Sequence, residues 1–135
     1  MPIEDDERIR EILEQSKTIA VVGASVKPWR DSNSIADFLD AEGYRVIPVN
    51  PKYTEVLGIQ CYPNLKAIPD PIDIVDIFRN SEAVPEIVEQ AIDIKAKTIW
   101  MQLGVLNEKA AKQAEDAGLN VVMDKCILVE HKRLL

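Results

Sequence analysis

The sequence contains the stretch Thr18-Ile19-Ala20-Val21-Val22-Gly23-Ala24-Ser25, in which a short apolar run ends at a glycine followed by two small residues. Consecutive apolar residues put apolar side chains on both faces of a strand, because successive side chains point to opposite sides. Strands of this kind are typical of parallel sheets that are covered by helices on both faces. We therefore interpret residues 18–22 as a buried strand of an α/β sheet.

Further apolar runs alternate with helical patterns along the chain. We expect strands over residues 44–49, 72–78, 98–103 and 119–123, with a minor strand over 58–62. We expect amphipathic helices over residues 5–15, 34–42, 82–97 and 107–118. Strands separated by helices of this length pair in parallel through right-handed crossovers. The pattern predicts a Rossmann-like, doubly wound, mainly parallel sheet of five to six strands, with helices on both faces in three layers.

Length and composition indicate one small domain. The 135 residues predict a single domain over 1–135, and the hydrophobic content of 47% is enough for a buried core. No apolar run approaches the roughly 20 residues of a membrane span. The acidic N-terminus does not resemble a signal peptide, so we expect a cytoplasmic location. The net charge of -7 predicts that neither nucleic acid nor a membrane is a partner.

Cysteine and histidine content excludes several kinds of site. Cys61 and Cys126 form neither a CxxC pair nor a zinc-binding spacing, and we expect both to be free thiols. The single histidine, His131, excludes histidine-based metal clusters and most catalytic triads. We expect it to lie in a solvated terminal segment. No catalytic residue and no metal ligand is predicted.

In a doubly wound sheet, ligands bind beyond the carboxyl ends of the strands, where the winding direction reverses. The segments that follow the predicted strands there are 23–34, 50–53, 78–81 and 102–104. Small residues, cations and amides are concentrated in these segments. We therefore expect the binding site at this edge.

The first of these segments has the features of a phosphate-binding loop. Small residues at Gly23, Ala24 and Ser25 allow a phosphate to approach the backbone, and the following helix can direct free N–H groups at it. The alternative is an ordinary tight turn in which Ser32 or Ser34 caps the helix. A full GxGxxG is absent, so generic dinucleotide binding has weak support.

Four cations follow strands at the same predicted edge: Lys27, Arg30, Lys52 and Arg79. Each alone is compatible with a solvated surface residue, but together they supply local positive potential in an acidic chain. We favour a binding role for the two arginines, which can grip a phosphate through two hydrogen bonds, and leave the lysines open.

Residues after the second and fourth strands bear on the choice of cofactor. Asn50 stands about where an NAD-binding protein places the carboxylate that binds the ribose. This argues against NAD as the cofactor without excluding it. Trp100 and Met101 are expected in the core. Gln102 is compatible either with a bond to a ligand amide or with a structural role.

Several motifs in this order resemble one family over nearly the whole chain. They are Val22-Gly23-Ala24-Ser25 with Pro28 and Arg30, Gly43-Tyr44 with Val46, Pro48-Val49-Asn50-Pro51, Asp76-Ile77-Phe78-Arg79, Trp100-Met101-Gln102-Leu103-Gly104, and Val121-Val122-Met123-Asp124 followed by Cys126. The chain resembles the small stand-alone CoA-binding proteins. Their fold is similar to the CoA-binding domain of the succinyl-CoA synthetase alpha subunit and of ADP-forming acyl-CoA synthetases.

The resemblance implies roles for particular residues. It places Gly23, Ala24 and Ser25 along the CoA phosphates with Lys27 and Arg30 beside them, and Ser32 is a further candidate. It places Asn50, Pro51 and Lys52 beside the nucleotide, Phe78 and Arg79 on the crevice wall, and Gln102 and Gly104 along the pantetheine arm.

Three functions remain open from the sequence. The first is a module that binds CoA or an acyl-CoA without chemistry of its own, as a homo-oligomer or with an enzyme partner. The second is a small NAD(P)-linked reductase or isomerase. The third is a regulatory subunit of an acyl-CoA ligase complex. The related ligases pass phosphate through a histidine in a second domain, for which this chain has neither the length nor a suitably placed histidine.

Overall fold

The computed structural model describes all residues from 1 to 135. Its main sheet has five parallel strands in the order β2-β1-β5-β6-β7. The strands are β1 (Thr18–Val22), β2 (Arg45–Val49), β5 (Ile74–Ile77), β6 (Thr98–Met101) and β7 (Asn120–Val122). The chain winds outward from β1 to β2 on one side and from β5 to β7 on the other. The winding direction therefore reverses between β1 and β5, where a crevice forms.

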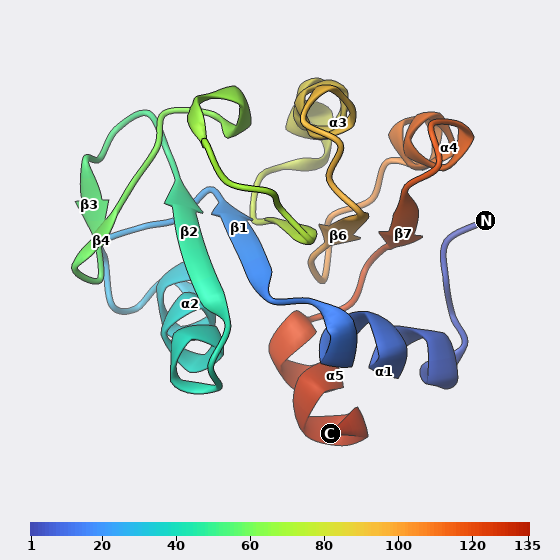
Figure 1. Cartoon of the computed structure of the whole chain (residues 1–135), viewed down its shortest axis with the longest axis horizontal. Helices are drawn as coiled ribbons and strands as arrows, with labels where there is room; N and C mark the ends of the chain where they lie inside the picture. Colours follow the sequence, from blue (N-terminus) through green and yellow to red (C-terminus); the bar gives the residue numbers. More distant parts are fainter.

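Helices cover both faces of this sheet, as the apolar strands predict. They are α1 (Asp6–Gln15), α2 (Asp31–Ala41), α3 (Val84–Asp93), α4 (Glu108–Asp116) and α5 (Ile127–Leu134), with 3-10 turns η1 (Leu65–Ala67) and η2 (Ser81–Ala83). Figure 1 shows α3 and α4 on one face and α1, α2 and α5 on the other. The Rossmann-like three-layer fold is confirmed. No helix has the length and apolar character needed to cross a membrane.

Each face of the sheet has its own core. Val75, Ile77 and Met101 pack with α3 and α4 on one face, and Trp100 packs with α1, α2 and α5 on the other. Trp100 is completely buried, and its Nε1 donates a hydrogen bond of 2.8 Å to the Lys125 carbonyl. The expectation that Trp100 and Met101 belong to the core is therefore confirmed.

The minor strand expected over 58–62 appears as β4 (Ile59–Gln60), which pairs antiparallel with β3 (Glu55–Val56) in a short hairpin, and Tyr62 forms an isolated parallel bridge to Val49 of β2. One expectation about local structure is corrected. Helix α2 begins at Asp31, three residues before the expected start at Ser34, so Ser32 lies inside the helix instead of capping it. The cap position is Arg30, whose side chain makes no capping hydrogen bond.

A further correction concerns the C-terminal segment. Residues expected to be solvated form α5, in which His131 is only 9% exposed. Its ring packs edge-on against Phe38 and Tyr44, with centroids 5.3 and 5.7 Å apart. The basic residues near the end of this helix suggest a solvated segment, but the helix also has an apolar face that begins with the fully buried Ile127. Burial of that face against α1 and α2 orders the segment.

Candidate functional site

Gly23 lies directly after β1, where the backbone that follows β5 approaches it closely. Its N–H donates to the Val49 carbonyl at 2.9 Å, and its φ of 91° lies in the left-handed region. A Cβ at this position would stand 2.6 Å from the carbonyl oxygen of Phe78, the residue that follows β5. Glycine is therefore required here both for its backbone angle and for its lack of a side chain.

The loop that follows is held by local hydrogen bonds. Ser25 Oγ accepts from the Lys27 N–H at 3.1 Å, and Asn33 Nδ2 donates to the Ser25 carbonyl at 2.8 Å. The Arg30 N–H donates to the Lys27 carbonyl at 3.1 Å across a turn that contains Pro28. These bonds give the loop a defined shape that needs no ligand.

Several backbone donors of this region are free. The N–H groups of Ser25, Val26, Asp31 and Ser32 donate no hydrogen bond within the chain. Two of them belong to the first turn of α2, which lacks a side-chain cap. A helix start with free N–H groups attracts an anion, because the helix dipole adds to the hydrogen bonds.

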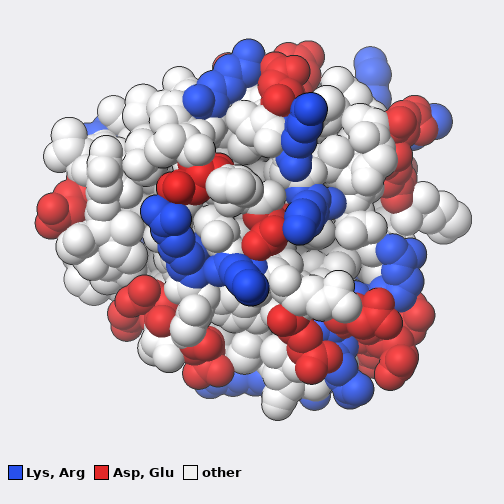
Figure 2. Space-filling model, viewed as in Figure 1, with Lys and Arg blue, Asp and Glu red and all other residues white.

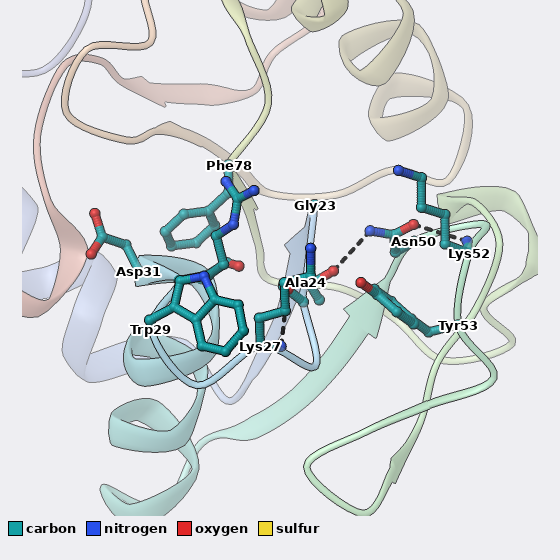
Figure 3. A pocket seen from close by; sticks show the side chains of 12 residues that line it. Gly23, Ala24, Lys27, Trp29, Asp31, Asn50, Lys52, Tyr53 and Phe78 are labelled. Atoms are coloured by element: carbon teal, nitrogen blue, oxygen red, sulfur yellow. Dashed lines mark hydrogen bonds between the residues drawn. The ribbon is translucent and has the colours of Figure 1, made fainter.

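Three of these residues, Ser25, Asp31 and Ser32, line an open cavity of about 430 Å³ at the carboxyl edge of the sheet. Figure 3 shows its walls, formed by the loop after β1 and the turn after β2. Nine of the thirteen predicted residues line it: Gly23, Ala24, Ser25, Lys27, Arg30, Ser32, Asn50, Lys52 and Phe78. The structure thus brings together most of the candidates from three separate segments.

The cations of the cavity have no acidic partner. Lys27, Arg30 and Lys52 are exposed, and none forms an ion pair within 4.0 Å, nor does the neighbouring Arg79. Asp31 is the one acidic residue that lines the cavity. Figure 2 shows basic side chains mixed with acidic ones on the face it presents. Attraction of an anion therefore depends on this local group of cations.

Asn50 has a structural task that the sequence did not reveal. Its Nδ2 donates to the Ala24 carbonyl at 2.8 Å, and its Oδ1 accepts from the Lys52 N–H at 2.9 Å, as Figure 3 shows. The amide thereby ties the loop after β1 to the turn after β2. Asn50 positions the cavity walls through these bonds.

The remaining predicted residues lie outside this cavity. Arg79 and Gln102 line a second cavity of about 500 Å³, which shares Asp31 and Phe78 with the first. Gln102 Oε1 accepts from the Ile127 N–H at 3.1 Å, so its side chain holds the start of α5. Pro51 lines neither of these two cavities, but a third one together with Arg79.

Gly104 also lines neither cavity. It is exposed, and its N–H donates to Asp124 Oδ1 at 2.7 Å in the turn after β6. Its φ of 84° explains the glycine by backbone geometry alone.

Three residues that the prediction omitted, Trp29, Asp31 and Tyr53, line the first cavity. All three lie in segments that follow predicted strands, which is the signal that would have identified them. Cys126, at the cap position of α5, lines the second cavity.

The two cysteines are free but differ in environment. Cys126 is half-buried, whereas Cys61 is buried and its Sγ donates to the Asn50 carbonyl at 3.5 Å. Burial raises the pKa of the Cys61 thiol. The expectation of two free thiols therefore agrees with the structure.

Comparison with known proteins identifies the family. A family model described as a CoA binding domain matches residues 17–132. The chain belongs to the CoA-binding domain family. This CoA-binding domain is 44% identical to YneT of Bacillus subtilis over 123 residues, which is 91% of each chain. It is also 50% identical to a solved protein from Pyrococcus horikoshii, with a TM-score of 0.95 and coverage of 99% of this chain and 96% of that one.

Larger relatives contain a similar region. An ADP-forming acetate–CoA ligase of Archaeoglobus fulgidus is 32% identical over 121 residues, 82% of this chain but only 18% of the ligase. A solved acetyl-coenzyme A synthetase of Korarchaeum cryptofilum matches with a TM-score of 0.75 at 26% identity, over 84% of this chain and 27% of that one. This CoA-binding domain therefore corresponds to a small part of these enzymes.

Proposed function

We propose that this protein binds coenzyme A or an acyl-CoA at the carboxyl edge of its sheet. The observation that carries the proposal is the uncapped start of α2 beside three unpaired cations, in a chain of net charge -7. Free N–H groups and unpaired cations are the groups that hold phosphate oxygens. Gly23, Ala24 and Ser25 would lie along the phosphates, with Lys27 and Arg30 beside them and Lys52 on the opposite wall.

The second cavity suits the other end of the same ligand. It shares Asp31 and Phe78 with the first, and six of its ten lining residues are hydrophobic. A long cofactor with a charged end and a less polar arm fits two adjoining spaces of this kind. Arg79 and Gln102 would lie along the arm, and Gln102 Nε2 makes no hydrogen bond within the chain.

The geometry favours CoA over NAD. No carboxylate stands in residues 50–54, directly after β2, and the Asn50 amide at this position is already bonded to Ala24 and Lys52. A ribose diol would have to compete with those bonds. CoA carries a 3′-phosphate in addition to its diphosphate, whereas NAD carries only the diphosphate, and the unpaired cations would neutralise this extra charge.

Isothermal titration with CoA, acetyl-CoA and NAD⁺ tests the proposal. Mass action predicts that CoA at about 100 times its Kd stabilises the fold by about 2.7 kcal/mol, with a rise in Tm. Arg30→Ala is expected to weaken CoA binding about tenfold, the loss of one charge-assisted contact to phosphate. Lys109→Ala is the matched control, because Lys109 is an exposed cation on α4 without an ion pair.

The outcomes separate the alternatives. Binding of CoA that is weakened by Arg30→Ala and unaffected by Lys109→Ala supports the proposal. Absence of binding at millimolar CoA, or tighter binding of NAD⁺ than of CoA, overturns it.

A further inference from the structure

The aromatic side chain of Trp29 is exposed to solvent. It is 76% exposed, whereas Trp100, the other tryptophan, is completely buried in the core. The Trp29 indole Nε1 donates no hydrogen bond within the chain. Leaving so large an apolar surface in water forfeits the stabilisation that its burial would give. The fold therefore gains little from the exposed indole.

The backbone beneath this side chain is fixed. Trp29 follows Pro28 in the turn closed by the bond from the Arg30 N–H to the Lys27 carbonyl at 3.1 Å. Helix α2 begins two residues later, at Asp31. An exposed ring on a defined backbone loses less conformational freedom when a ligand stacks on it than a ring on a mobile loop.

The surroundings of the ring define what it could bind. Trp29 lines the first cavity together with the cations Lys27, Arg30 and Lys52, and with Tyr53 of the turn after β2. In Figure 3 the Trp29 and Tyr53 rings lie on either side of Ala24. Flat apolar surfaces beside positive charge match a ligand that joins an aromatic base to phosphate groups.

We propose that Trp29 stacks on the adenine base of the bound cofactor and so makes this cavity selective for adenine-containing forms. The inference rests on the proposed function and deepens it, since it assigns the base end of the ligand to the turn after β1. A ligand that ends before the adenosine gains nothing from Trp29.

Three ligands test the inference by titration: CoA, adenosine 3′,5′-bisphosphate and 4′-phosphopantetheine. Stacking of one base on an aromatic side chain contributes enough that Trp29→Ala is expected to weaken CoA binding by at least about fivefold. Adenosine 3′,5′-bisphosphate is expected to lose affinity in the same proportion, and 4′-phosphopantetheine to bind unchanged. Trp29→Phe is the conservative variant and is expected to restore most of the affinity.

Fluorescence gives a second, independent readout. Acrylamide is expected to quench Trp29 in the free protein and to leave the buried Trp100 emission largely intact. Adding CoA or adenosine 3′,5′-bisphosphate to the wild type is expected to shield Trp29 from acrylamide, and 4′-phosphopantetheine is not. Trp29→Phe, which retains only Trp100, supplies the baseline.

Each result decides one question. Unchanged CoA affinity in Trp29→Ala, or an equal loss for 4′-phosphopantetheine, overturns the role of Trp29 while CoA binding itself stands. A wild type that binds none of the three ligands overturns the proposed function instead.

Discussion

Asp76 is expected to make the stability of this fold decrease as the pH rises. It lies in the middle of β5, paired in register with Val21 on one side and Trp100 on the other. The residue is completely buried, and neither carboxyl oxygen has a hydrogen-bond partner. Loss of hydration on burial raises the pKa of Asp76 well above its ordinary value.

The sign of the effect follows from linkage. A group whose pKa is higher in the folded chain holds its proton more tightly there than in the unfolded chain. Its contribution is fully present below the unfolded value of about 3.9 and is lost as the pH rises through the folded value. Within that interval each pH unit lowers the free energy of unfolding by about 1.4 kcal/mol. Asp76→Asn removes this loss because an amide does not titrate.

Urea denaturation between pH 4.5 and 8 measures the effect. The free energy of unfolding of the wild type is expected to fall with rising pH relative to that of Asp76→Asn, and the gap to become constant above the folded pKa. Asp37→Asn is the matched control, since Asp37 is exposed and forms no ion pair, and its curve should run parallel to the wild type. Parallel curves for Asp76→Asn and the wild type would refute the reasoning.

Two further predictions concern the glycine at the crevice and the thiols. Gly23→Ala and Gly118→Ala share a φ of 91°, but only Gly23 has the Phe78 carbonyl oxygen in the way. Gly23→Ala should therefore cost about 1–3 kcal/mol more in urea denaturation than its control, and equal losses would contradict the steric argument. A disulfide reagent should modify Cys126 before the buried Cys61, whose pKa is raised. The prediction is wrong if Cys61 in a Cys126→Ser variant reacts with the reagent as fast as Cys126 does in the wild type.

Much of the fold could be predicted because the signals are local. Neighbouring residues alone are enough to interpret the apolar run 18–22 as a strand and the periodic pattern around Val84 as a helix. The structure contains them as β1 and α3, respectively. The C-terminal helix could not be predicted in this way. Its apolar face becomes evident only in the fold, where Ile127 belongs to the same core cluster as residues of α1 and α2.

The candidate site divides in the same manner. Gly23, Ala24 and Ser25 could be placed at the carboxyl edge because they follow an apolar strand directly. The tasks of Asn50 and Gln102 could not, since each bonds a backbone group about 25 residues away in the chain. The type of a side chain shows which hydrogen bonds it can make, but its partner depends on which distant segments the fold brings together.

The amino-acid sequence by itself determined the alternation of strands and helices, the family and the small residues after the first strand. The elements and the small residues are properties of short segments, in which neighbouring side chains decide between conformations, and the family follows from the order of several such segments along the chain. The tertiary structure decided that the ends of β1, β2 and β5 face one cavity, that Trp29 stays exposed and that Asp76 is isolated from water. These depend on strand order and on packing between distant segments, where burial and hydrogen bonding are settled together.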